Sequence, residues 1–377
     1  MSEAKHLVWL DVTRWFAMFF VVVSHAGDTF NFNAPPGDTA YAFWGEVWGS
    51  LARFCVPVFA MMTGFLLLPV KQDGGAFAKK RIGRVLPPFL FWSVLYCLLP
   101  WLVALCGGTN DTLRIFIPFA DCGVGWAPTW AALRQIPLNF CALTTHMWYV
   151  YMLIGLYLVL PVFSPWYEKA NAKAKWAFLG LWGVSLVLPY VRNYLGDGHV
   201  WGECAWNDYG LLYGFSGFLG YAVLGSMLGH LRTWSWTKTL LVSVPLLVGG
   251  FAVTYFGYHH MIVVTNNDYA TYAKQIELYW TFCSPNVVAM SAAVFLLTKK
   301  CVHLPSGLAR ALADVNRCGF GIYCAHYLFI GAVFHVCVKP LALPVPVQLP
   351  LTALLSYFVV WGVVHVLRAL PLLRRIA

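Results

Sequence analysis

The sequence predicts an all-α polytopic membrane protein of about ten transmembrane helices, with both termini in the cytoplasm. Three observations predict this class: 60% of the 377 residues are hydrophobic, only 11% are charged, and the mean hydropathy is +0.67. A typical soluble domain is about half apolar and about a quarter charged. The composition therefore excludes a soluble enzyme, a disordered chain and a collagen-like chain.

Ten apolar segments are each long enough to cross a bilayer as a helix, which satisfies its own backbone hydrogen bonds in lipid. They cover residues 8–29, 44–69, 84–106, 146–165, 176–195, 209–229, 239–257, 277–298, 318–338 and 348–368. Ten spans of about 20 residues use just over half of the chain. The remainder suffices only for short loops, so we expect one integral membrane domain over residues 1–377 and no appended soluble domain.

The Lys and Arg residues set the orientation of these spans. With the N-terminus in the cytoplasm, 19 of the 25 basic residues lie on the cytoplasmic side. They are Lys5, Arg14, Lys71, Lys79, Lys80, Arg81, Arg84, Lys169, Lys173, Lys175, Arg232, Lys238, Lys299, Lys300, Arg310, Arg317, Arg368, Arg374 and Arg375. This bias predicts an even number of spans. It also accounts for most of the net charge of +10, so no nucleic-acid partner is expected.

The first span, WLDVTRWFAMFFVVVSHAGD, contains charged and titratable residues, which are costly in lipid and mark functional sites by default. Arg14 and His25 are eleven residues apart, which is three helical turns plus about 20°, so they share one face about 16 Å apart along the axis. A histidine can accept a proton from a hydroxyl group near neutral pH, and Asp28, one turn later, could orient it. The alternative is an arginine that reaches the interface and a histidine with a structural hydrogen bond.

The segment KKRIGRVLPPF opens the third span with a basic cluster. Arg81 and Arg84 are three residues apart and share a helix face at the cytoplasmic mouth. Together with Lys79 and Lys80 they form a candidate phosphate clamp. The alternative is a purely topological anchor.

Other spans also contain polar residues that need a cavity or a partner in lipid. Arg53 precedes CVPVFAMMTGF, His146 opens the fourth span in THMWYVY, and His326 lies in CGFGIYCAHYLF. The alternative for each histidine is a structural hydrogen bond. Three glycines would allow close helix approach, namely Gly64, Gly319 and Gly321.

Two predicted external loops are rich in aromatic residues. Residues 107–145 contain Trp126 and Trp130, and residues 196–208 contain Asp197, His199, Trp201, Glu203, Trp206 and Asp208. Aromatic rings stack on sugar faces and carboxylates accept protons from sugar hydroxyls, so these loops favour a sugar-binding surface that includes Glu203. The alternative is an interfacial aromatic belt.

The eleven cysteines show no metal-ligand spacing, so no metal site is expected. Five fall in apolar runs and are interpreted as small hydrophobic residues: Cys55, Cys97, Cys283, Cys324 and Cys337. Cys122 and Cys141 fall in an external loop, where a disulfide is an open alternative.

Taken together, these motifs resemble those of the acyltransferase-3 family of integral membrane acyltransferases. In the family's first span, ten residues separate an Arg from a His, and this pair corresponds to Arg14 and His25. The family's RxxR at the start of the third span corresponds to Arg81 and Arg84. Its Arg-x-x-Val-Pro stretch, followed by Ser-Gly, resembles RFCVPVFAMMTGF, in which Thr63 keeps a hydroxyl group.

Two further motifs match in later spans. The family's His-hydrophobic-Trp corresponds to His146 and Trp148, and its G-I-Y-x-x-H corresponds to Gly321, Ile322, Tyr323 and His326. The matches run from residue 11 to residue 326. Among the stand-alone members of the family, the chain looks most like the O-acetyltransferases that modify enterobacterial common antigen and related surface polysaccharides.

The resemblance implies a multi-pass enzyme of the bacterial inner membrane that moves an acetyl group from cytoplasmic acetyl-CoA to an external or lipid-linked sugar. On this hypothesis the CoA phosphates bind Arg81, Arg84 and Lys80, and Arg14 binds the donor part-way along or pairs with a carboxylate. His25 is the general base, oriented by Asp28. His326 or His146 stabilises the oxyanion or positions the acceptor, which Trp148, Arg53 and Glu203 help to bind.

Two other classes of function remain as alternatives. A secondary transporter of an acidic solute or lipid-linked sugar would also need intramembrane Arg and His, although no pair of broken helices recurs in matching halves of the chain. A non-catalytic membrane scaffold would leave Arg14, His25 and the basic clamp unexplained.

Overall fold

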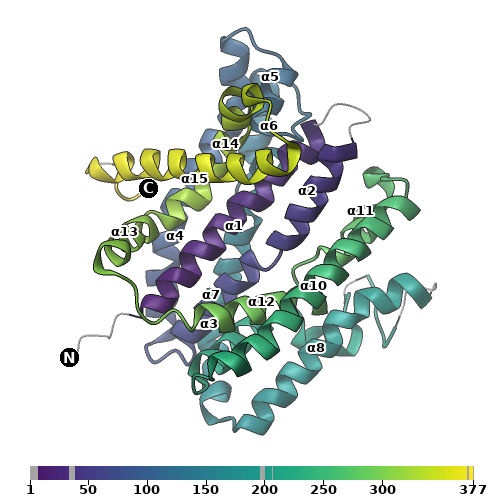
Figure 1. Ribbon diagram of the computed structural model, residues 1–377, viewed down its shortest axis with the longest axis vertical. Coiled ribbons are helices and arrows are strands. Elements are labelled where there is room, and N and C mark those ends of the chain that lie inside the picture. Colours follow the sequence, from purple (N-terminus) through teal and green to yellow (C-terminus); the bar gives the residue numbers. More distant parts are fainter. Residues whose placement is uncertain (1–6, 34–38, 196–199, 206, 372, 377) are drawn as a thin grey trace. The chain divides into compact units, whose positions relative to one another are not determined.

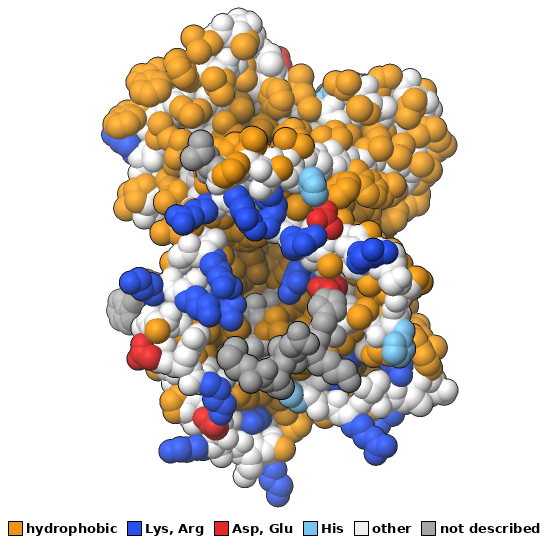
Figure 2. Space-filling model, turned by 90° about the vertical axis from the view of Figure 1, so that its left-hand side faces the viewer, with side chains coloured by type: hydrophobic (Ala, Val, Ile, Leu, Met, Phe, Trp, Pro, Cys, Tyr) orange, Lys and Arg blue, Asp and Glu red, His pale blue; other side chains and the backbone are white. Residues whose placement is uncertain are grey.

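The structure is a computed structural model that describes residues 7–33, 39–195, 200–205, 207–371 and 373–376. These residues form fifteen α-helices joined by short 3₁₀ and π segments, and they contain no β-strand. Figure 2 shows one face, on which Lys and Arg side chains gather beside broad areas of hydrophobic side chains. Basic residues next to apolar surface are typical of membrane proteins.

Eight helical segments are long and apolar enough to cross a membrane. They are Val8–Phe30, Thr39–Leu67, Gly74–Leu105, Ala142–Lys169, Ala172–Leu195, Trp236–Val264, Gly319–Leu341 and Val345–Ala369. They confirm the all-α polytopic class and eight of the ten predicted spans.

The sixth and eighth predicted spans are shorter helices than expected. α9 covers Leu219–His230 and α12 covers Pro285–Thr298, and each follows a separate 3₁₀ segment. Gly217 precedes α9 with φ +84°, a left-handed conformation that interrupts the helix. Pro285 starts α12 because it lacks the N–H that a preceding turn would need. The apolar runs therefore continue past these points, but the helices do not.

The chain forms two compact units. The first contains Met1–Ala17, Arg53–Phe77 and Leu158–Ala309, and the second contains Met18–Ala52, Ala78–Tyr157 and Arg310–Ala377. Four helices contribute residues to both units: α1 (Val8–Asn33), α4 (Gly74–Leu105), α7 (Trp148–Lys169) and α13 (Ser306–Arg317).

The first unit contains, besides α9 and α12, the helices α3 (Cys55–Leu67), α8 (Ala172–Leu195), α10 (Trp236–Val264) and α11 (Tyr269–Ile276). Within it α10 packs along α12 (Figure 1), and α3 packs along α9.

Glycines bring α3 and α9 into backbone contact. A Cβ atom on Gly64 would lie 1.9 Å from the carbonyl oxygen of Ala222, and one on Gly225 would lie 2.2 Å from that of Met61. The close approach predicted at Gly64 is therefore confirmed. The prediction for Gly319 is wrong, because a Cβ atom there meets nothing within 4 Å. The role of Gly321 stays a prediction.

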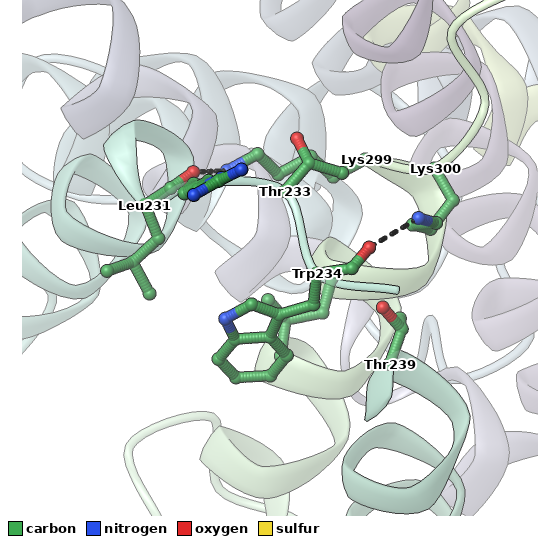
Figure 3. A pocket seen from close by; sticks show the side chains of 8 residues that line it. Leu231, Thr233, Trp234, Thr239, Lys299 and Lys300 are labelled. Atoms are coloured by element: carbon green, nitrogen blue, oxygen red, sulfur yellow. Dashed lines mark hydrogen bonds between the residues drawn. The ribbon is translucent and has the colours of Figure 1, made fainter. Parts of the chain in front are cut away.

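Two lysines at the end of α12 hold the turn between α9 and α10. The Nζ of Lys299 donates to the carbonyl oxygens of Leu228 (2.8 Å) and Leu231 (2.7 Å), and the Nζ of Lys300 donates to that of Trp234 (2.6 Å). Figure 3 shows these lysines beside a pocket of about 10 Å³, the size of one water molecule. The last carbonyls of a helix lack partners within the helix, so the two bonds from Lys299 satisfy carbonyls at the end of α9.

Replacing Lys299 with Met should lower the free energy of unfolding by about 1–3 kcal/mol, because the carbonyl of Leu228 loses its donor while buried and that of Leu231 loses its donor while part-buried. Thermal unfolding of the purified protein in detergent measures this change. Lys173→Met, at an exposed position, is the control and should leave the unfolding midpoint unchanged. Equal losses in both variants would contradict the structural role of Lys299.

The second unit contains most of α1 and α4 and the first half of α7, together with α2 (Thr39–Ala52), α5 (Asn110–Phe116), α6 (Trp126–Gln135), α14 (Gly319–Val333) and α15 (Val345–Ala369). α14 packs along α15. The 3₁₀ helix η1 (Ala142–Met147) leads directly into α7. The buried side chains of this unit include three tyrosines and two histidines, which form the cluster described next.

Candidate active site

His25 and Asp28 form a hydrogen-bonded pair on α1. The Nδ1 of His25 lies 2.8 Å from the Oδ2 of Asp28, and the two side chains are 23% and 19% exposed. A carboxylate only accepts hydrogen bonds, so Nδ1 carries the proton of the neutral imidazole and Nε2 carries a lone pair. The hydroxyl of Tyr327 donates to the same Oδ2 at 3.4 Å, and its ring centroid lies 5.0 Å from that of His25. The pair thus leaves one basic nitrogen available.

Two further histidines complete a triangle with His25. The ring centroid of His25 lies 6.2 Å from that of His146, on η1, and 5.2 Å from that of His326, on α14. His146 and His326 are 5.4 Å apart. Both are buried. Residues that are far apart in the sequence therefore meet at one point in the second unit.

Backbone carbonyls fix the tautomers of these two histidines. The Nδ1 of His326 donates to the carbonyl of Tyr323 at 2.7 Å, one turn earlier in α14, and the Nε2 of His146 donates to the carbonyl of Cys324 at 3.3 Å. The remaining nitrogens, Nε2 of His326 and Nδ1 of His146, are buried and have no hydrogen-bond partner among the described residues. All three histidines therefore offer a lone pair, which can accept a hydrogen bond from a hydroxyl group.

Tyrosines hold the backbone around the cluster. The hydroxyl of Tyr96, on α4, lies 3.1 Å from the carbonyl oxygens of both Cys324 and Ala325 and accepts from the amide of Leu328 at 3.0 Å. The hydroxyl of Tyr323 donates to the carbonyl of His146. Of these tyrosines, only Tyr323 falls in a sequence motif. Tyr96 and Tyr327 carry no sequence signal, because a tyrosine in an apolar segment is typical of any membrane helix.

The cluster has the chemistry of a proton acceptor. Within the described ranges, no group of three or more His, Cys, Asp and Glu side chains is arranged to hold a metal ion. A histidine paired with a carboxylate, with further hydrogen-bond acceptors nearby, fits the deprotonation and positioning of hydroxyl groups.

The basic cluster lies on the first turns of α4, in the same unit. Asp73 caps this helix by accepting from the amide of Ala76 at 2.8 Å, and the helix runs without a break through Arg81 and Arg84. Arg84 is exposed, as are Lys79 and Lys80, whereas Arg81 is half-buried. The phenol of Tyr157, on α7, lies close enough to both guanidinium groups to interact with them electrostatically. The four basic side chains thus form an accessible cationic patch.

Arg14 and Arg53 belong to the first unit. Arg14 pairs with the carboxylate of Asp11, one turn earlier in α1, at 3.4 Å. Arg53 lies at the break between α2 and α3, and its guanidinium carbon lies 4.0 Å above the ring of Trp280 and 5.6 Å from that of Phe282. Both arginines therefore have partners within their own unit. Trp148, in the second unit, is half-buried at the start of α7.

Glu203 is held in a buried ion pair. Its Oε1 lies 2.7 Å from the Nη1 of Arg192, and only 6% of its side chain is exposed. Arg192 also donates to the carbonyl of Asp208 at 3.1 Å. Arg192 and Asp208 line a pocket of about 500 Å³ whose wall includes Lys274 and Glu277. The sequence gives no signal for this pocket, because its walls come from the end of α8, the loop before η2 and the segment from α11 through η3.

Three residues of the predicted sugar-binding loop, Asp197, His199 and Trp206, lie outside the described residues, as does Lys5. Trp201 is exposed with φ 52°. Trp126 and Trp130 are exposed on α6 and stack with ring centroids 6.3 Å apart. The described tryptophans of both loops are therefore accessible.

Comparison with known proteins gives one result for this chain. The family model described as "Acyltransferase domain", of the acyltransferase-3 type, matches residues 7–365. No curated protein and no solved structure matches the chain.

Proposed function

The chain belongs to the acyltransferase-3 family of membrane acyltransferases, and we propose that it transfers an acetyl group from cytoplasmic acetyl-CoA to a hydroxyl of an external or lipid-linked cell-surface sugar. The observation that carries the reaction is the pair of His25 and Asp28, which offers a basic nitrogen beside two further histidines. The eight span-length helices support a place in the bacterial inner membrane, between a cytoplasmic donor and an external acceptor.

In the proposed reaction the Nε2 of His25 takes the proton of the acceptor hydroxyl. The hydroxyl oxygen then attacks the carbonyl carbon of the thioester and forms a C–O bond. The C–S bond breaks, and the CoA sulfur leaves with the proton that His25 had taken. Asp28 stabilises the imidazolium while it exists, as a carboxylate does for a catalytic histidine.

His146 and His326 suit the binding of the acceptor better than the stabilisation of an oxyanion. An oxyanion needs hydrogen-bond donors. The free nitrogens of these two histidines carry lone pairs, because their N–H groups are bound to backbone carbonyls. We therefore propose that they accept hydrogen bonds from the reacting hydroxyl or its neighbours on the sugar.

Arg81, Arg84 and Lys80 are proposed to bind the phosphates of acetyl-CoA. Their positions on the first turns of α4 and the topology predicted from the basic residues support this role. A guanidinium group binds a phosphate through two parallel hydrogen bonds, which favours the two arginines as the main contacts. The ion pair of Arg14 with Asp11 supports the alternative in which Arg14 pairs with a carboxylate.

The pocket at Arg192 is proposed to bind part of the acceptor glycan. Its wall offers cations, carboxylates and amides, the mixture of donors and acceptors that a polyhydroxylated ligand needs. Glu203 would act through Arg192, which it orients. Arg53, whose guanidinium carbon lies over the ring of Trp280, and Trp148 remain proposed contacts on the acceptor side.

The function is tested with purified protein in lipid nanodiscs. We expect saturable binding of acetyl-CoA, with coenzyme A as the control ligand, and transfer of radiolabelled acetyl to glycolipids extracted from cells that lack the protein. Well-folded protein that binds no acetyl-CoA would contradict the proposal. Counterflow of an unmodified solute in proteoliposomes, independent of acetyl-CoA, would favour a transporter instead.

Replacing Asp28 with Asn should lower kcat by about 10²–10⁴-fold, with little change in acetyl-CoA affinity. Asparagine leaves the imidazolium without a counter-charge and also allows the wrong tautomer of His25. Steady-state kinetics and a binding isotherm separate the two quantities. The control is Tyr327→Phe, which removes only a long hydrogen bond to Asp28 and should cost less than tenfold. A kcat within threefold of wild type for the asparagine variant would refute the orienting role.

A further inference from the structure

Four basic residues meet at the turn between α9 and α10 in the first unit. Arg232 lies in this turn and Lys238 on the first turn of α10, and Lys299 and Lys300 follow the end of α12. Arg232 and Lys238 are exposed, Lys300 is half-buried and Lys299 is buried. The hydrogen bonds of the two lysines to the turn join two segments that are both predicted to be cytoplasmic (Figure 3). We call these four residues the α9–α10 patch.

The segments that form the α9–α10 patch carry no carboxylate. Residues 209–267 and 278–313, which contain α9, α10 and α12, have neither Asp nor Glu. The ammonium groups contact neutral partners instead. Lys299 and Lys300 donate to backbone carbonyls, and the Nζ of Lys238 lies 4.6 Å from the centre of the Trp234 ring. Positive charges that their own segments leave without a counter-charge attract an anionic ligand.

The two lysines keep N–H donors for such a ligand. An ammonium group has three N–H donors. Lys299 uses two of them on carbonyls and Lys300 uses one, so both retain donors with no hydrogen-bond partner among the described residues. Arg232 lines the same pocket of about 10 Å³, which admits one phosphate oxygen but not a whole phosphate group. A phosphate at the mouth of this pocket would therefore meet a guanidinium group as well as ammonium groups.

Exposed apolar side chains adjoin the α9–α10 patch. Trp236 is 55% exposed, and the Nζ of Lys300 lies 5.1 Å from the centre of its ring. Further along α10, Leu241, Val244 and Val248 are exposed, and their spacing places them on one face of the helix. Tryptophan is typical of the boundary between membrane and water, and an apolar helix face suits acyl chains. The combination fits a lipid with an anionic headgroup better than a free phosphate ion, which makes no use of apolar surface.

We propose that the α9–α10 patch is a binding site for an anionic phospholipid of the cytoplasmic leaflet. The phosphate of the headgroup binds the four basic side chains, and the acyl chains lie along the exposed face of α10. Basic pockets between membrane helices on the cytoplasmic side recognise anionic headgroups in this way. The site is separate from the proposed chemistry in the sequence and in the fold, because the histidine triangle and the arginines of α4 belong to the second unit.

The proposal is tested by native mass spectrometry of the full-length protein in detergent, titrated with phosphatidylglycerol or with phosphatidylcholine of the same acyl chains. The measurement counts bound lipid and needs no acyl transfer, so its outcome is independent of the proposed function. We expect wild-type protein to bind phosphatidylglycerol at least ~30-fold more tightly than phosphatidylcholine. Replacing Arg232 and Lys238 together with Gln should weaken phosphatidylglycerol binding by about 30-fold, since each cation near a membrane surface contributes about fivefold. Lys299 and Lys300 are left intact because they hold the turn.

The matched control replaces Lys169 and Lys173 with Gln, which removes two exposed cations where α7 meets α8 in the same unit. It has the same net charge as the patch variant and should keep the wild-type affinity for phosphatidylglycerol. Equal losses in the two double variants, or equal binding of the two lipids by wild type, would overturn the proposal. Displacement of phosphatidylglycerol by millimolar glycerol 3-phosphate would show that the patch takes a soluble phosphate, and would overturn it as well. The comparison of the two lipids on wild type does not depend on the folding of any variant.

Discussion

Replacing His25 with Ala should abolish acyl transfer, with a loss in kcat of at least ~10²–10⁴-fold, while the protein still binds acetyl-CoA. His25 is the only member of the histidine triangle that is hydrogen-bonded to a carboxylate in the described residues. Its removal takes away the base and leaves Asp28 with only the long hydrogen bond from Tyr327. Transfer of radiolabelled acetyl to glycolipid measures the loss, and the binding isotherm shows that the donor site is intact.

The control for this variant is His303→Ala, which removes an exposed imidazole in a loop of the first unit. It should retain the wild-type rate. A His25→Ala protein that acetylates its acceptor at the normal rate would remove His25 from the mechanism. His146→Ala and His326→Ala should instead raise KM for the acceptor, since their proposed role is to hold its hydroxyls.

Replacing Arg81 and Arg84 together with Ala should weaken acetyl-CoA binding by about 10²–10⁴-fold. Each guanidinium is expected to contribute about 1.5–3 kcal/mol through charge-assisted hydrogen bonds to phosphate. The single variants Arg81→Lys and Arg84→Lys should each weaken binding about tenfold, because a planar fork becomes a point charge. Isothermal titration in nanodiscs measures these affinities.

The matched control is Lys173→Ala, which removes another basic residue that the predicted topology places in the cytoplasm. Its affinity for acetyl-CoA should equal that of wild type, which separates a specific clamp from a general attraction of anions to basic loops. Wild-type affinity in both single lysine variants would show that the arginines only anchor the helix. This test measures affinity and the His25 test measures rate. The role of the arginines and the role of His25 can therefore be contradicted independently.

The sequence predicts the helices better than it predicts their ends. Apolar length identifies eight spans, since burial in lipid demands it along the whole segment. It overestimates the lengths of α9 and α12, because hydropathy does not detect the left-handed conformation of Gly217 or the missing amide hydrogen of Pro285. These are properties of single backbone positions, which a window of about 20 residues averages away.

The same holds for the candidate site: the sequence predicts which residues belong to it but not how their side chains are hydrogen-bonded. His25, His146 and His326 can each be selected because a titratable group in a span needs a reason to be there. The tautomers of His146 and His326 cannot be predicted, since they depend on which carbonyls of α14 come within reach. Nor can the partner of Arg53 be predicted, because Trp280 reaches it only through the packing of the first unit.

The glycine contact between α3 and α9 has a consequence for engineering the protein toward higher thermostability. A helical Gly replaced by Ala gains about 0.5–1 kcal/mol where the new methyl group meets no obstacle. Gly155, Gly180 and Gly183 have such open space. At Gly64 and Gly225 the obstacle is the main chain of the opposite helix, so no second-site substitution can make room. A library that randomises helical glycines should therefore leave these two unchanged.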